Sequence, residues 1–264
     1  MKITVLMENT AADATMFAEH GLSLYIQTAK HNILFDMGQT DAFARNAEAL
    51  GVDLRDADIA ILSHGHYDHG GGLARFLEIN DRAPVYLHRR AFGEYYHGPE
   101  KYIGLAKSLK LSARLRYVDE DLAIDDTLSL HARNTAPLTR PIESFGLSEV
   151  CCGVHTPDRF AHEQYLLIRE GQKTVLISGC AHKGVVNIAR WFEPDVLIGG
   201  FHLAKLNPAV PEQHAQLSSI ADDLLAGHTS YYTGHCTGAP AYAYLKERMG
   251  QRLHALTTGL TFTI

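Results

Sequence analysis

Four side chains that can bind a metal ion are concentrated in one short stretch of the chain. They are His64, His66, Asp68 and His69. The apolar segment Asp58–Ser63 precedes them, and Gly70-Gly71-Gly72 follows them and opens a helix. In extended backbone, residues i and i+2 project to the same side, so the first two histidines can bind one ion, while the turn through Tyr67 lets Asp68 and His69 face a second. Two ions about 3.5–4 Å apart can bind both the attacking and the leaving oxygen of a hydrolysis.

So short a cluster cannot complete two coordination spheres, and further ligands must come from distant loops. The second half of the chain offers three histidines that lie close to a glycine and follow an apolar run: His182, His202 and His235. A single histidine is more often an exposed or structural residue than a ligand. The repetition of one pattern at three strand ends favours metal ligands.

Short apolar runs alternate with helix-period segments, which predicts an α+β or α/β fold of the sandwich class. The predicted strands are Ile3–Glu8, Leu22–Thr28, Asn32–Asp36, Asp58–Ser63, Val85–His88, Leu115–Asp119, Thr127–Ala132, Gln164–Arg169, Thr174–Ser178, Val196–Gly199, Ser230–Thr233 and Leu260–Ile264. The predicted helices are Ala42–Leu50, Leu73–Ile79, Val185–Phe192, Glu212–Leu225 and Tyr242–Met249, with Pro211 and Pro240 just before the last two. Each half repeats an apolar strand that ends in a histidine-containing loop, which places the polar loops on one edge of the sheets.

Composition narrows the class of protein. The 264 residues carry a formal net charge of −6 and no run of basic residues, which disfavours a nucleic-acid substrate. No apolar stretch approaches the roughly 20 residues of a membrane helix, and the amino terminus is typical of a first strand rather than a signal peptide. We therefore expect a cytoplasmic protein without a membrane partner. The four cysteines lack disulfide spacing and are expected to be reduced.

The motif His-x-His-x-Asp-His resembles the hallmark of the metallo-β-lactamase-fold superfamily. The likeness covers nearly the whole chain and looks closest to the branch containing dihydropterin ribofuranosyl-aminobenzene phosphate synthase-like proteins. The segments that carry it are Glu8-Asn9-Thr10, His20-Gly21, Phe35-Asp36-Met37-Gly38, Gly-Cys-Ala-His-Lys-Gly from Gly179, Gly-Gly-Phe-His-Leu from Gly199 and Gly-His-Cys-Thr-Gly from Gly234. The resemblance implies one domain over residues 1–264, folded as a four-layer αββα sandwich. It also implies two divalent ions, Zn, Mn or Fe, at one edge between the sheets.

Two positions depart from the patterns of this superfamily. His66 stands where the di-iron flavoprotein relatives have Glu, which favours hydrolytic or transfer chemistry over reduction of oxygen or nitric oxide. Cys180 stands where most members have a bridging Asp. Either its thiolate is a ligand, or Cys180 is a buried apolar residue and His182 is the ligand. The intermediate histidine of the superfamily has His162 as its closest candidate here and His155 as a weaker one.

Such a site predicts a dinuclear hydrolase that uses a metal-bound hydroxide on a small ester, lactone, thioester or phosphoester. Asp68 would be both a ligand and a proton carrier, and Asp36 either orients a ligand histidine or caps a turn. Substrate contacts are expected from His20, His202 and Lys183. The tyrosines of the segment 92–105 are interpreted as packing residues or as a lid.

Two other classes of function stay open. One is a synthase that condenses an aromatic acid with a phosphoribosyl donor in pterin-type cofactor biosynthesis. The other is a non-enzymatic metal-binding module in which Cys180 has cost the chain its activity. The expected partner in the enzymatic cases is a small, anionic or ester-like molecule.

Overall fold

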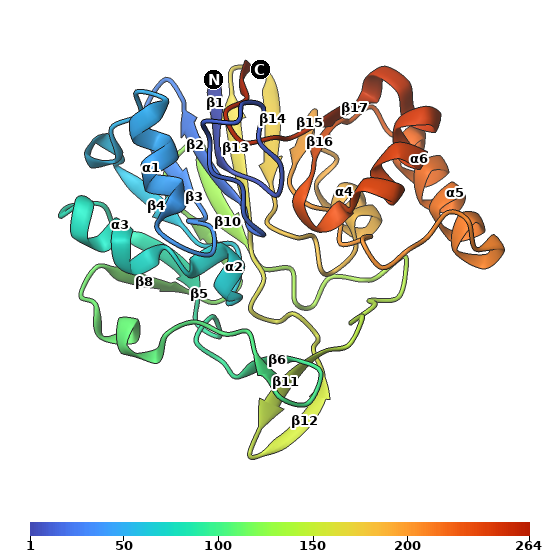
Figure 1. Ribbon diagram of the computed structural model, residues 1–264, viewed down its shortest axis with the longest axis horizontal. Helices are drawn as coiled ribbons and strands as arrows, with labels where there is room; N and C mark the ends of the chain where they lie inside the picture. Colours follow the sequence, from blue (N-terminus) through green and yellow to red (C-terminus); the bar gives the residue numbers. More distant parts are fainter.

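The computed structural model describes residues 1–264 and consists of four layers. Two seven-stranded sheets face each other, and helices cover the outer face of each (Figure 1). The first half of the chain, drawn in blue to green, forms most of one sheet, and the second half forms most of the other. The expected αββα sandwich is therefore confirmed.

The first sheet has the spatial order β18-β1-β2-β3-β4-β5-β8. Its strands are β1 (Lys2–Met7), β2 (Ser23–Gln27), β3 (Asn32–Phe35), β4 (Ile59–Ile61), β5 (Val85–His88), β8 (Leu115–Val118) and β18 (Thr261–Thr263). From β3 to β8 the strands are parallel, whereas β1 pairs antiparallel with both β2 and β18. The helices of this half are α1 (Ala42–Ala49), α2 (Tyr67–Gly70) and α3 (Leu73–Ile79).

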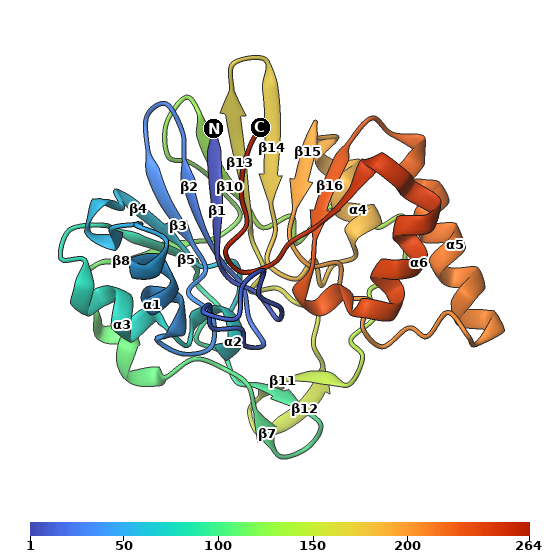
Figure 2. The ribbon, with the colours of Figure 1, turned by 45° about the horizontal axis from the view of Figure 1, so that its top comes forward.

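The second sheet has the order β17-β16-β15-β14-β13-β10-β9. Its strands are β9 (Asp121–Ala123), β10 (Leu128–His131), β13 (Tyr165–Glu170), β14 (Lys173–Ile177), β15 (Val196–Ile198), β16 (Ser230–Thr233) and β17 (Leu253–Ala255). Here β14 to β17 are parallel. Figure 2 shows the helices of this half on the outer side of the sheet: α4 (Val185–Phe192), α5 (Pro211–Ala226) and α6 (Ala239–Met249).

Three hydrophobic cores hold the four layers together. The central core lies between the sheets and takes alternate residues from both, such as Ile3 and Val5 of β1 and Leu166 and Ile168 of β13. The intervening residues of β13 face outward, where Tyr165 joins the core beneath α4, α5 and α6. A third core packs α1 and α3 against the first sheet. Successive side chains of a strand point to opposite faces of its sheet, so a strand that is covered on both faces contributes residues to two cores in turn.

A third, four-stranded sheet was not predicted. It has the order β12-β11-β6-β7 and lies at one edge of the sandwich (Figure 1). Its strands are β6 (Tyr95–His97), β7 (Lys101–Tyr102), β11 (Leu147–Cys151) and β12 (Val154–Pro157). All four are short, and Tyr95 is the only fully buried residue in them, so their sequences lack the apolar alternation that reveals the main strands. The short strands β9 and β17 were missed for the same reason.

The predicted helices are all present, but two begin earlier than expected. α5 begins at Pro211 and α6 at Ala239, so that both prolines lie inside the first turn. Proline is favoured there because the first backbone N–H groups of a helix have no acceptor within the helix. None of the helices has the length and apolar character needed to cross a bilayer.

We expect the central core to dominate the stability of this fold. Leu166→Ala removes a fully buried side chain between the sheets, and should lower the free energy of unfolding by about 2–5 kcal/mol. Leu111→Ala is the matched control, because Leu111 is 90% exposed and its loss should change stability by less than about 0.5 kcal/mol. Urea titration followed by circular dichroism measures both. Equal effects would contradict the layer assignment.

Candidate metal centre

The candidate ligands lie at the carboxyl ends of parallel strands in both sheets. The segment from Ser63 to His69 follows β4, and Asp36 follows β3 in the first sheet. In the second sheet the loops after β14, β15 and β16 carry His182, His202 and His235. Because parallel strands end at the same edge of a sheet, the loops of the two sheets lie opposite each other at one edge of the central core.

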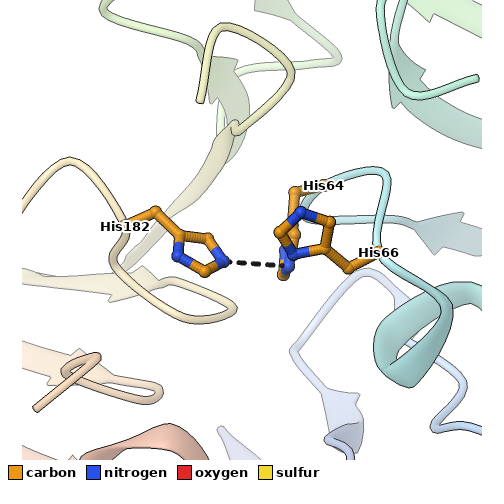
Figure 3. A group of neighbouring side chains, drawn as sticks. All are labelled: His64, His66 and His182. Atoms are coloured by element: carbon orange, nitrogen blue, oxygen red, sulfur yellow. Dashed lines mark hydrogen bonds between the residues drawn. The ribbon is translucent and has the colours of Figure 1, made fainter. Parts of the chain in front are cut away.

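The first group of donors consists of His64, His66 and His182, all buried. One ligand atom from each lies within 4.8 Å of the others. Figure 3 shows the ring of His182 pointing across the gap between the sheets toward the two histidines of the motif, and the Nε2 atoms of His182 and His64 are 3.3 Å apart. The buried Nε2 of His66 has no hydrogen-bond partner.

The second group lies beside the first and is built around His69. Its Nε2 atom is 3.1 Å from Nε2 of His235 and 3.1 Å from Sγ of Cys180. Nε2 of His235 is in turn 3.4 Å from Oδ2 of Asp68. Cys180 also groups with His64 and His69, so its thiol lies between the two sets of donors. This placement makes the thiol of Cys180 a candidate ligand, as one sequence-based interpretation expects, while Cys180 is also only 2% exposed, as the other expects.

The outer nitrogens of His64, His69 and His235 are each engaged by a protein group. Nδ1 of His69 is 2.7 Å from Oδ2 of Asp36, and this oxygen also accepts the hydroxyl hydrogen of Ser63. Since that hydroxyl has no other hydrogen, its oxygen must accept from Nδ1 of His64 at 2.7 Å. The amide oxygen of Asn9 accepts from Nδ1 of His235 at 2.8 Å. Each of the three rings therefore carries its hydrogen on Nδ1.

This tautomer assignment leaves the Nε2 lone pairs of His64, His69 and His235 directed inward. Two lone pairs at 3.1 Å, as on His69 and His235, repel each other unless a cation lies between them. Imidazole, thiolate and carboxylate at such spacing form the donor set that zinc and related ions prefer. Hydrogen bonds to the outer ring nitrogen are also the usual support of a metal-binding histidine. The residues present thus fit divalent ions.

The electrostatics of the site favour a positive charge at the same place. Burial and the neighbouring His69 and His66 hold the pKa of His64 well below its usual range. Burial also opposes charge on His69, but the carboxylates of Asp36 and Asp68 outweigh it and raise the pKa of His69 to about 9. Burial opposes ionisation of Asp68, yet His69, His20 and His235 hold its pKa well below the ordinary value. A proton, or a metal ion in its place, is therefore stabilised between these groups.

His162 is close to the first group but has no free nitrogen. Its Nδ1 accepts from the backbone N–H of Gly65 at 2.9 Å, and its Nε2 is 3.1 Å from Oδ2 of Asp158. Its ligand atom also lies within 4.8 Å of those of His66 and Asp158, so His162 stays a candidate ligand although both of its nitrogens have protein partners. The weaker candidate, His155, is exposed on β12 and is hydrogen-bonded to Ser148. The third histidine of the first group is instead His182.

The three expected substrate contacts have different environments. His20 is half exposed, and its Nε2 is 3.3 Å from Oδ2 of Asp68. His202 lies beside His182, and its Nε2 is buried without a partner. Lys183 does not fit the expectation, because it is only 2% exposed and its Nζ donates to the backbone oxygens of Ala132 and Glu163 at 2.6 and 3.1 Å. It does not line the cavity beside the ligands.

Sequence reasoning missed several acidic residues that position the ligands. Glu163 is fully buried and accepts from the backbone N–H of His182 at 2.7 Å and from that of Lys183 at 3.1 Å. Glu8 accepts from the backbone N–H of His235. Asp158 lies 3.9 Å from Nε2 of His66. An acidic residue directly next to a buried strand was the only signal for Glu163 and Glu8.

A cavity of about 500 Å³ opens beside the donors. Residues from both groups line it together with side chains of the small sheet: His20, His66, Asp68, His97, Lys101, Ile103, Phe145, Leu147, Cys180, His182, His202, Lys205 and His235 among them. This volume suits a small molecule of drug-like or nucleotide size.

Gly65 holds the two histidines of the motif in place. A Cβ atom there would lie 2.1 Å from the backbone oxygen of Ala91, so Gly65→Ala must displace the loop that carries His64 and His66. We expect this variant to lose about 1–3 kcal/mol of stability and a large part of its metal content. Gly227→Ala is the control, since nothing lies within 4 Å of its Cβ position. Thermal unfolding and elemental analysis would contradict the proposal if the two variants behaved alike.

Asp36 should control metal affinity without being a ligand. Asp36→Asn replaces one of two accepting oxygens with an NH2 group, so the side chain can no longer accept from His69 and the Ser63 hydroxyl at one end and from the Ser63 backbone N–H at the other. Loss of such a partner costs about 10–100-fold in metal affinity. Competition with a chromophoric chelator measures this, with the exposed Asp41→Asn as control. Unchanged affinity would show that Asp36 only caps the turn.

Comparison with known proteins places the chain among proteins of the same architecture. A sequence profile of the metallo-beta-lactamase superfamily matches residues 17–234. An uncharacterized protein of Methanocaldococcus jannaschii is 30% identical over 255 residues, which cover 93% of this chain and 94% of the relative. The 7,8-dihydropterin-6-methyl-4-(beta-D-ribofuranosyl)-aminobenzene-5'-phosphate synthase of that organism is 28% identical over 283 residues, covering 97% and 95%.

A solved structure is similar over its whole length. The crystal structure of a metal-dependent hydrolase of the beta-lactamase superfamily has a TM-score of 0.81 and 27% identity to this chain, covering 100% of this chain and 99% of the other. The profile match spans most of the sequence, including the histidine motif, and the similarity in fold extends to both ends. This chain belongs to the metallo-beta-lactamase superfamily.

Proposed function

We propose that this protein is a dinuclear metal-dependent hydrolase of a small ester, lactone, thioester or phosphoester. The observation that carries the proposal is the set of inward Nε2 lone pairs, fixed by Asp36, Ser63 and Asn9 on the outer side of the rings. The similarity to a structure described as a metal-dependent hydrolase supports the class of reaction.

The two groups of donors give the proposed ligands. One ion would be held by His64, His66 and His182, and the second by Asp68, His69 and His235, with Cys180 between them. We propose zinc in preference to manganese or iron, because a thiol among imidazoles is a soft donor set. When bound, such ions supply Lewis acidity to a carbonyl or phosphoryl oxygen and lower the pKa of a water toward neutrality.

Asp68 would be placed to accept a proton from a water that attacks a substrate in the cavity. Its Oδ2 lines the cavity and is 3.3 Å from Nε2 of His20. The amide of Asn9 donates to Nδ1 of His20 at 3.2 Å, which leaves the hydrogen of His20 on Nε2, facing the carboxylate. This N–H holds Asp68 ionised and oriented before attack, and the exposed edge of His20 connects the pair to solvent. His202, whose Nε2 is unpartnered, is available for the substrate.

The similarity to the pterin-pathway synthase supports a second candidate, a synthase or transferase acting on a phosphoribosyl donor. The same residues would then hold ions that bind the departing pyrophosphate. The two candidates differ in a simple property, since a hydrolase consumes water with one organic substrate, whereas a synthase needs two organic substrates together.

Removal of one ligand from the second group should lower both the activity and the metal content of the protein. We expect elemental analysis to give about two ions per chain for the purified protein and fewer for Asp68→Ala and His235→Ala, because each loses a ligand. Hydrolysis of a panel of phosphoesters, lactones and thioesters should fall at least about 100-fold in both variants and in chelator-treated protein. An unchanged metal content in both variants would refute the ligand assignment.

The exposed His228→Ala serves as the matched histidine control, because it lies outside both groups of donors. It should keep the metal content and activity of the wild type. If the intact metal-loaded protein hydrolyses nothing in the panel but forms product from an aromatic acid and a phosphoribosyl donor, the synthase replaces the hydrolase.

A further inference from the structure

The small sheet is fastened directly to the metal-binding motif. The backbone N–H of Tyr67 donates to the oxygen of Ile103 at 2.8 Å, and His66 forms an isolated bridge with Gly104. The segment that follows β7 is therefore hydrogen-bonded to the motif at Tyr67, which lies between the proposed ligands His66 and Asp68. Any side chain on the inner face of this sheet is held at a fixed position relative to the proposed centre.

Register decides which side chains make up that inner face. His97 pairs with Lys101 of β7 on one side and with Leu147 of β11 on the other, so these three form one cross-strand row. Side chains directly opposite each other share a face of the sheet. All three line the 500 Å³ cavity. The next row, Ser148, Tyr96 and Tyr102, has the opposite direction and is absent from the cavity wall.

The tyrosines of this segment are therefore packing residues, which was one of the two interpretations of the sequence. Tyr96 and Tyr102 pack edge to face with ring centroids 5.4 Å apart. Tyr95 is buried, packs on His162 and donates its hydroxyl hydrogen to the backbone oxygen of Arg90. The residues that cover the cavity are histidine, lysine and leucine.

Positive charge is concentrated at the mouth of this cavity. Lys101 lies on the small sheet and Lys205 on the loop after β15, and both line the cavity. Lys101 is the register partner of His97, and partial burial together with the ammonium groups of Lys205 and Lys101 lowers the pKa of His97. Nζ of Lys101 is 5.6 Å from the ring centroid of Tyr67, the residue between His66 and Asp68.

Neither lysine has an anionic partner. Lys107, on the same segment, pairs with Glu94 at 3.9 Å, but no ion pair is formed by Lys101 or Lys205. Asp68 is the only carboxylate among the residues that line the cavity, and it belongs to the metal-binding motif. Ile103, Phe145 and Leu147 make the remaining wall apolar. The cavity thus has the candidate metal ligands on one side, an apolar wall on another and, at its rim, two lysines that have no anionic partner.

We propose that Lys101 and Lys205, with His97, bind a phosphate-monoester dianion at the non-reacting end of the substrate, whose apolar part lies against Ile103, Phe145 and Leu147. Two ammonium groups balance the two charges of a phosphate monoester, and the neutral imidazole adds a hydrogen-bond donor. A carboxylate would leave one cation unpaired. The proposal rests on the proposed function, because it assigns the reacting end of the same substrate to the floor of the cavity.

Equilibrium binding tests the lysines independently of catalysis. Isothermal titration calorimetry with phenylphosphonate, which has no ester bond to hydrolyse, on the metal-loaded protein should give an affinity that falls about 10-fold in Lys101→Ala and in Lys205→Ala, and weakens as salt increases. Lys101→Arg should restore most of the loss. Lys110→Ala is the control, since Lys110 is a lysine of the nearby segment that does not line the cavity and should leave binding unchanged. Benzoate should bind more weakly and depend less on the two lysines.

Metal content, measured in the same samples, separates this proposal from the proposed function. Affinity for phenylphosphonate that is equal in the wild type and both alanine variants would show that the metal centre alone holds the dianion, and would overturn the proposal. So would the absence of phenylphosphonate binding in protein that still hydrolyses neutral esters. Lysine-dependent binding in protein that hydrolyses nothing would instead overturn the hydrolase and leave the phosphate site standing.

Discussion

The centre depends on inward Nε2 atoms that lie so close together that a proton or a metal ion must lie between them. Asp36 is the anchor of this arrangement, because one of its carboxylate oxygens fixes Nδ1 of His69 directly and Nδ1 of His64 through the hydroxyl of Ser63. Its other oxygen accepts from the backbone N–H of Ser63 and so fixes the end of β4. A single fully buried carboxylate thereby sets the tautomer of two rings and the path of the chain that carries them.

The backbone around the centre adopts conformations that non-glycine residues rarely use. Asp36, Ala181, His202 and His235 all have positive φ values between 48° and 56°. Each lies in the loop that follows a strand, where the chain must reverse direction while it directs a side chain back toward the gap between the sheets. Strain of this kind persists only where surrounding contacts enforce it, and the buried carboxylates of Glu8 and Glu163 supply such contacts to the loops of His235 and His182.

The sandwich and the small four-stranded sheet differ in what they contribute to the candidate site. The sandwich provides three cores and a row of parallel strand ends, and it fixes the donors to within hydrogen-bonding distances. The small sheet contributes few buried side chains of its own, yet it closes the cavity because the backbone of Tyr67 is hydrogen-bonded to Ile103. The proposed metal ligands and the proposed phosphate-binding residues therefore belong to separate elements that are joined at Tyr67. In this arrangement, substitutions in the small sheet can alter which substrate is bound without moving the ligands on the sandwich.

The sequence by itself determined the main strands and helices, because their burial imposes a period of two or of three to four on the apolar residues. It also determined the motif from His64 to His69, since these ligand types follow a strand within a few positions. Only the tertiary structure decided that His182 lies with His64 and His66, whereas the nitrogens of His162 face the backbone of Gly65 and Asp158, because these positions depend on contacts between loops far apart in the chain. The same holds for Lys183, whose charge suggested a substrate contact and whose Nζ is buried against two backbone oxygens. The inner row of the small sheet was decided by register, which pairs residues far apart in the chain and leaves no local periodicity to detect.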